Sequence, residues 1–119
     1  LYPGLSVVVV AGRLDASRLE RVTINLLDHT KKSKTQVVLI DLSAALIVDD
    51  SRVASQLIKA IRTVHLLGAQ YVLAGIQSSV AQALEPLITD LGSVKSFSSI
   101  EIALEEALSI LGFKITKAD

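Results

Sequence analysis

The sequence predicts an α/β fold, with a four- to five-stranded, mostly parallel or mixed sheet covered by about four helices. Short β-branched runs alternate along the chain with longer segments in which apolar residues recur at helical spacing. The strand-like runs are continuously apolar, which is typical of strands buried on both faces of a parallel sheet. The 119 residues are enough for one domain with its own hydrophobic core.

Four segments are predicted as strands. The first three are short, mainly apolar runs, the first two of them rich in β-branched residues, and the fourth is a weaker match to the same pattern. They span residues 6–11, 36–42, 70–74 and 94–97. Because a helical segment separates each strand from the next, we expect the later strands to be parallel and joined by right-handed crossovers.

The first two helices are predicted from apolar residues at helical spacing. In the first, that spacing begins at Leu14, with Asp15 as the expected N-cap and lysines near the end, where the helix dipole favours cations. The second begins near Ser51 and stops at Gly68.

Two further helices follow. The third covers residues 78–91 and contains Pro86, so we expect a kink or break there, because an interior proline costs about 3 kcal/mol. The last covers residues 100–111, with Ser98 or Ser99 as its cap. The polar tail, residues 114–119, is expected to fray.

Composition excludes several classes of site and partner. Without cysteine, the chain has no disulfide, thiolate zinc site or cysteine nucleophile. A balance of 12 basic and 12 acidic residues, with few aromatics, argues against a nucleic-acid partner. No apolar run approaches the roughly 18 to 20 residues of a membrane span, and the first residues lack the basic start of a signal peptide. We therefore expect a cytoplasmic protein without a membrane segment.

The loops after the predicted strands hold few reactive groups. Gly12 stands alone, without the further glycines or the lysine of a phosphate-binding loop. His29 and His65 lie late in helices with no ligand at metal-binding spacing, so surface or cap roles are predicted for both. Ser78 and Ser79 begin a helix, where capping alone accounts for them. We expect no catalytic residue, no metal and no cofactor.

The densest polar cluster is Asp49-Asp50-Ser51-Arg52, at the start of the second predicted helix. Ser51 or Asp50 could cap that helix. The two carboxylates could instead bind a hard cation such as Mg²⁺, but the other strand ends lack the acidic residue and lysine that such a site needs. In a third interpretation Ser51 accepts a phosphate, which would meet the positive end of the helix dipole and add about 1.5 to 2 negative charges.

Taken in order, several segments resemble the STAS domain, which is shared by anti-sigma-factor antagonists and sulphate-transporter tails. They read GRLD at 12–15, VLIDLS at 38–43, VDDSRVA at 48–54, LLGA at 66–69 and VLAGIQ at 72–77. The chain resembles in particular the stressosome modulators, or co-antagonists, of bacterial general stress signalling and their small STAS scaffold partner. Modulators carry an N-terminal sensory domain, so a chain that starts at Leu1 is expected to be the C-terminal part of a longer protein.

The resemblance implies a non-enzymatic signalling domain that assembles with related STAS proteins, as a homodimer or larger assembly, and sequesters an anti-sigma or switch serine/threonine kinase. That kinase phosphorylates a hydroxyl residue that follows an aspartate at the start of the second helix, here Ser51 after Asp50. The segment from Ile40 to Asp50 is one residue longer than the family pattern. Either it holds an insertion, or Asp50 occupies the acceptor position with a permanent charge. Ala83 replaces the modulators' second acceptor, so that site is expected to be absent.

A supporting surface for partners is expected around the acceptor. Its members are Asp15, Asp49, Asp50, Arg52, Ser78 and Ser79.

Two other functions are compatible with the sequence. The chain could be a structural STAS domain of a transporter or assembly protein that is never phosphorylated. It could also be an enzyme or nucleotide-binding domain, which would require a pocket where acidic groups converge. The candidates for that pocket are Asp15, Asp41, Asp49 and Asp50.

Overall fold

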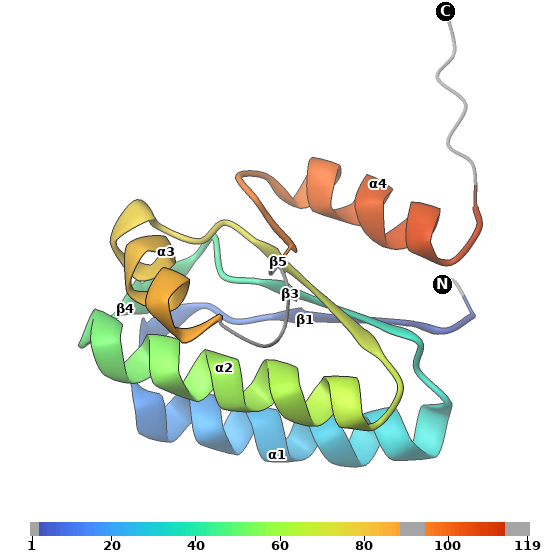
Figure 1. Ribbon diagram of the computed structural model, residues 1–119, viewed down its shortest axis with the longest axis horizontal. Helices are drawn as coiled ribbons and strands as arrows, with labels where there is room; N and C mark the ends of the chain where they lie inside the picture. Colours follow the sequence, from blue (N-terminus) through green and yellow to red (C-terminus); the bar gives the residue numbers. More distant parts are fainter. Residues whose placement is uncertain (1–2, 89–94, 114–119) are drawn as a thin grey trace, which may run out of the picture.

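Four parallel strands form a sheet at the centre of the molecule, with helices packed on both faces (Figure 1). The computed structural model describes residues 3–88 and 95–113. The strands lie in the order β1 (Leu5–Val9), β3 (Val37–Asp41), β5 (Gln70–Ala74) and β6 (Lys95–Phe97). The helices are α1 (Ala16–Ser33), α2 (Asp50–Leu66), α3 (Ser78–Leu84) and α4 (Ile100–Ile110). All three strand pairings are parallel, which confirms the predicted α/β fold class.

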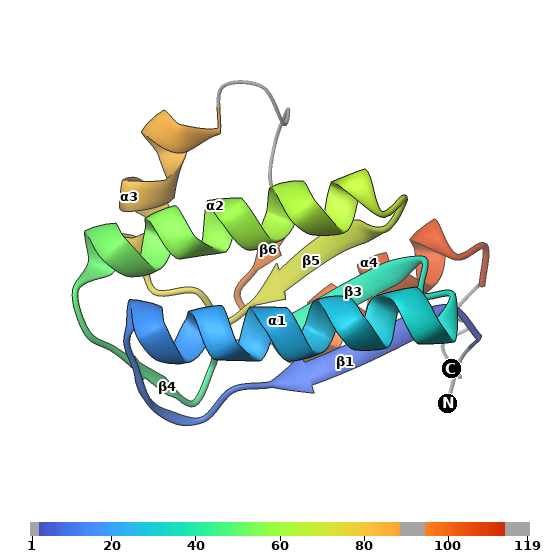
Figure 2. The ribbon, with the colours of Figure 1, turned by 90° about the horizontal axis from the view of Figure 1, so that it is seen from below.

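The two faces of the sheet have separate cores. Helices α1 and α2 lie side by side under one face, whereas α4 covers the other (Figure 2). In β3, Val38 and Ile40 point toward α1 and α2, while Val37 and Leu39 point toward α4. This alternation explains why β3 is apolar throughout: both of its faces are buried.

The first strand corrects one expectation. Its apolar run predicted burial on both faces, but Val7 is 49% exposed and Val9 is 65% exposed. Helix α4 packs on β3, β5 and β6, and β1 is the edge strand, so the α4 side of β1 is left largely uncovered. The strand also ends at Val9 rather than at Ala11.

A second, two-stranded parallel sheet was not predicted. In it, β2 (Gly12–Leu14) pairs with β4 (Ala45–Ile47). Because Gly12 N donates to Ala44 O at 3.0 Å, this pairing follows directly on the pairing of β1 with β3. Leu14 therefore belongs to a strand, and its assignment to the first helix is wrong. Strands of three residues are too short to show a period, so only their pairing reveals them.

The break in the third helix is confirmed. Helix α3 ends at Leu84, and a 3₁₀ turn, Glu85–Leu87, contains Pro86 near its start, where the missing N–H is tolerated. The remainder of that predicted helix, residues 89–91, lies outside the described residues, as do Val94 of the last predicted strand and the tail 114–119.

Two predicted caps are observed. Asp15 Oδ1 accepts a hydrogen bond from Arg18 N at 2.8 Å at the start of α1. Of the two serines proposed for α4, Ser99 is the cap, and its Oγ accepts from Ile102 N at 3.3 Å. These bonds satisfy backbone donors that the first turn of a helix leaves without a partner.

Among the described residues, one buried side-chain polar atom lacks a partner, and it lies in the core beneath α1 and α2. Tyr71 is only 7% exposed, and its hydroxyl has no hydrogen-bond partner among the described residues. Burial raises the pKa of the Tyr71 phenol above its ordinary value, because the ionised form would lose its hydration.

Tyr71→Phe is expected to increase the free energy of unfolding by about 1 kcal/mol, because it removes a buried hydroxyl that gains nothing from the fold. The raised pKa in the folded state also means that the unfolded state ionises first. The wild type should therefore lose stability above about pH 10, and the variant should lose less. Urea unfolding at neutral and alkaline pH measures both effects, and a less stable variant at neutral pH would show that the hydroxyl is bonded.

Candidate functional site

The starts of α1 and α2 lie next to each other because β2 and β4 pair. Leu14 is opposite Ile47 in this ladder, and Val48 N donates to Leu14 O at 2.9 Å. The next residues along each chain segment are Asp15 and Asp49, the two helix caps. The small sheet thus brings together two helix N-termini that are more than thirty residues apart in the sequence.

Asp49 caps α2, which corrects the expectation that Ser51 or Asp50 would do so. Asp49 Oδ1 accepts from Arg52 N at 3.3 Å, and its Oδ2 lies 3.4 Å from Arg52 Nε. Asp49 has φ 64, in the left-handed region, which aspartate tolerates better than most residues. This backbone turn starts the helix at Asp50, so the cap lies earlier than the sequence suggests.

Ser51 is consequently exposed in the first turn of α2 without a structural role for its hydroxyl. Its Oγ has no hydrogen-bond partner among the described residues, and the cap bond that it was expected to make belongs to Asp49. The neighbouring Val53 and Ala54 point inward and are fully buried. Ser51 therefore faces solvent from a rigidly packed helix.

A shallow hollow of about 320 Å³ lies beside Ser51. Its described lining is Ala16 of α1 together with Ser51, Arg52, Ser55, Gln56 and Lys59 of α2. Residues four apart lie on one face of a helix, so Ser51, Ser55 and Lys59 form a continuous polar stripe. The lining holds two cations and two hydroxyls but no carboxylate.

The four aspartates considered as an acidic pocket do not line this hollow. Asp15 and Asp49 are engaged as helix caps. Asp41 Oδ1 accepts from Ser43 N at 3.0 Å and from Ser43 Oγ at 2.5 Å, which fixes the turn after β3. Within residues 3–88 and 95–113, no three histidine or acidic side chains are grouped so that they could hold a metal ion.

The serine pair of α3 lies apart from the hollow. Ser78 and Ser79 are exposed at the start of α3, but neither caps it. Gln77 is the N-cap residue and makes no side-chain bond, so the capping role predicted for these serines is wrong. Of the expected supporting surface, only Arg52 lines the hollow, next to the acceptor Ser51, and Asp49 is bound to Arg52.

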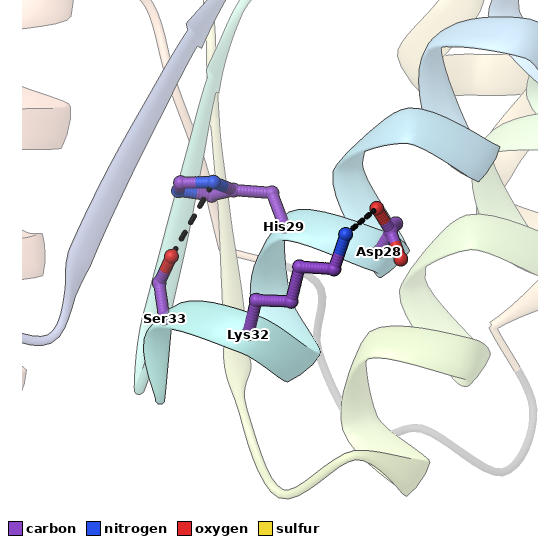
Figure 3. A network of polar contacts seen from close by, with 4 residues as sticks. All are labelled: Asp28, His29, Lys32 and Ser33. Carbon is purple, nitrogen blue, oxygen red and sulfur yellow. Dashed lines mark hydrogen bonds and ion pairs between the residues drawn. The ribbon is translucent and has the colours of Figure 1, made fainter.

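Both histidines lie on the surface, as predicted. His29 is exposed near the end of α1, where Ser33 Oγ is 3.4 Å from its Nδ1 and the adjacent Asp28 pairs with Lys32 at 3.0 Å (Figure 3). His65 is exposed in the last turn of α2. Neither is close to the hollow, which lies at the opposite end of both helices. No helix in the described part of the chain has the length and apolarity to cross a membrane.

Sequence reasoning missed Ser55, Gln56 and Lys59. Their signal was available as spacing, since Ser55 and Lys59 follow Ser51 by four and eight residues. The hollow itself was not predictable, because Ala16 comes from another helix and only packing places it there.

Comparisons with known proteins agree on a family. The STAS domain model matches residues 1–107. The RsbT co-antagonist protein RsbRA of Bacillus subtilis (strain 168) is 34% identical over 115 residues, which cover 97% of this chain and 42% of that protein. The chain thus spans less than half of that relative.

Solved structures share the fold. RsbS of Moorella thermoacetica superposes with a TM-score of 0.75 and 26% identity, over 94% of each chain. A structure from work on the molecular architecture of the stressosome has a TM-score of 0.72 at 24% identity, covering 95% of this chain and 97% of that one.

Proposed function

Since this chain belongs to the STAS domain family, we propose that it is a non-enzymatic signalling domain of the cytoplasm whose interactions are controlled by phosphorylation of Ser51. Its partners in this proposal are related STAS proteins and a switch serine/threonine kinase of the anti-sigma type. The family supports the choice of partners, because one relative is named as a co-antagonist of RsbT and a structural match comes from a stressosome.

The exposed hydroxyl of Ser51 is the observation that carries the proposal. Asp49 makes the cap bond of α2, so modification of Ser51 would not remove a bond that starts the helix. A phosphate there would lie at the N-terminal end of the helix, where the dipole and the free amides favour an anion. Arg52 and Lys59 in the adjoining hollow provide two cations close to that charge. The modification would therefore change the surface and leave the fold intact.

Asp50 offers a second form of the same control. If Asp50 occupies the acceptor position, the first turn of α2 carries a permanent charge and only partly imitates the phosphorylated state. Asp50 is half-buried, whereas Ser51 is exposed, which favours Ser51 as the residue that a kinase reaches.

A binding role also fits the way in which the acidic groups are used. The two capping aspartates and Asp41 stabilise the backbone, and the hollow beside Ser51 lacks a carboxylate that could act as general base. The surface near α2 is therefore suited to recognition by charge.

The test is phosphorylation of the domain, together with its STAS scaffold partner, by the cognate switch kinase and ATP. Mass spectrometry is expected to find one phosphate, on Ser51, that Ser51→Ala abolishes. Ser55→Ala serves as the matched control, since it removes an exposed hydroxyl one turn further along α2 and should leave the phosphate in place.

The outcomes separate the alternatives. Phosphate gained only after Asp50→Ser would assign the acceptor position to Asp50. Phosphate elsewhere, with kinase binding unchanged by Ser51→Ala, would remove this mechanism. A domain that takes no phosphate in any of these forms would be a structural STAS domain.

A further inference from the structure

The zero net charge of the chain hides an uneven distribution of charge between the two faces of the sheet. Helices α1 and α2 cover one face and carry seven arginines and lysines against three acidic residues. Helix α4 covers the other face and carries three glutamates and no basic residue. Figure 1 shows these helices on opposite sides of the sheet.

The basic side has an open point of contact in the hollow of α2. Arg52 is partly neutralised by Asp49, at 3.4 Å. Lys59 is exposed and forms no ion pair with a described residue. Lys59 therefore presents an uncompensated cation next to a concave surface.

The acidic side presents exposed glutamates on α4. Glu106 is bound by Lys95 at 2.6 Å, but Glu101 and Glu105 are exposed without an ion pair among the described residues. They lie one turn apart with Ile102, which is 48% exposed, next to them. The opposite face of α4, with Ala103 and Ala107, is buried against the sheet, so these side chains point outward.

From this complementarity we infer that α4 of one copy of the chain docks on the α2 hollow of a second copy, with Glu101 and Glu105 against Lys59 and Arg52. A second copy is the occupant because it carries the complementary charge in a fixed position. The two surfaces differ and lie on opposite sides of the sheet, so the contact is head-to-tail and each copy can extend the assembly. This inference rests on the assembly part of the proposed function and does not require phosphorylation.

Sedimentation of the purified domain tests the contact. At low salt, about 20 mM, the average mass should rise with protein concentration, and at about 500 mM it should return toward the monomer, because salt screens exposed charges. Lys59→Glu and Glu105→Lys should each abolish association, since each places like charges together. An equimolar mixture of the two variants should associate again, because both contacts in the mixed assembly pair opposite charges.

Arg13→Glu is the matched control. It changes the net charge as Lys59→Glu does, at an exposed residue of β2 outside both surfaces, and should leave association intact. Circular dichroism verifies that each variant is folded. A wild-type chain that stays monomeric at low salt, or a mixture that fails to recover association, would overturn the inference. A wild-type chain that takes phosphate on Ser51 and yet stays monomeric would overturn this contact alone.

Discussion

Gly75→Ala is expected to lower the free energy of unfolding by about 3 kcal/mol or more, the largest effect that an added methyl group should have at any of the described glycines. A Cβ atom at this position would lie 2.2 Å from Ser43 Oγ, 2.6 Å from Ser43 Cα and 2.7 Å from Ser43 N. The residue also has φ +72, which costs a side chain roughly 1 to 2 kcal/mol.

The clash is difficult to relieve because both loops are fixed. Gly75 N donates to Phe97 O at 2.8 Å, and Leu42 N donates to Ala74 O at 2.8 Å. Asp41 holds Ser43 through two hydrogen bonds. The turn after β3 and the turn after β5 therefore cannot separate without breaking bonds that close the ends of their strands.

Gly68→Ala distinguishes the clash from the backbone cost. Gly68 has φ +85, and a methyl group added there would have no atom within 4 Å, so only the conformational cost applies, roughly 1 to 2 kcal/mol. Urea unfolding compares the two variants through their midpoints. If both variants lost the same free energy of unfolding, the two loops would have moved apart, and the contact between residue 75 and Ser43 would contribute nothing to the loss.

Leu57→Ala is the second large effect, expected to cost about 2 to 5 kcal/mol. Leu57 is 0% exposed and packs in the core between α2 and the sheet, so its removal leaves a cavity that the surrounding side chains fill only in part. It lies on the inner face of α2, opposite the stripe that forms the hollow.

Leu66→Ala on the same helix is the control for that substitution. Leu66 is 84% exposed, so the change should alter stability by no more than about 0.5 kcal/mol. Thermal and urea unfolding measure the difference. A small loss of stability for Leu57→Ala would indicate that α2 shifts toward the sheet and fills the cavity, so that the inner face of α2 repacks more easily than its burial suggests.

The longer elements were predictable because their periods are clear. The strands β3 and β5, and the helices α1, α2 and α4, each follow a buried pattern long enough to be recognised. The exposure of Val9 was not predictable. An apolar run indicates that a strand is suited to burial, but it does not tell how far the helix that covers the strand extends. The break at Pro86 was predictable because the proline ring restricts the backbone at its own position, whatever the tertiary structure around it.

The candidate site was predictable only in part. The polar cluster around Ser51 was singled out from its residues, and the role of Ser51 stays a prediction. The cap of α2 was misplaced, because the left-handed turn at Asp49 has no clear sequence signal. The spacing of Ser55 and Lys59 from Ser51 was available in the sequence, but the hollow was not, because it also needs Ala16, which the packing of α1 against α2 brings there. The spacing of side chains along α2 could thus be obtained from the sequence, whereas the caps of α2 and α3 and the contact between α1 and α2 could not.

The pairing of β2 with β4 has a consequence for how a partner recognises this domain. A peptide covering residues 48–54 would contain every side chain of the acidic cluster, yet it would have neither the adjoining end of α1 nor the hollow. Residues 12–14 and 45–47 must meet before that surface exists. A protein that bound it would therefore distinguish folded from unfolded chains, and, if Ser51 is phosphorylated as proposed, one charge state from another.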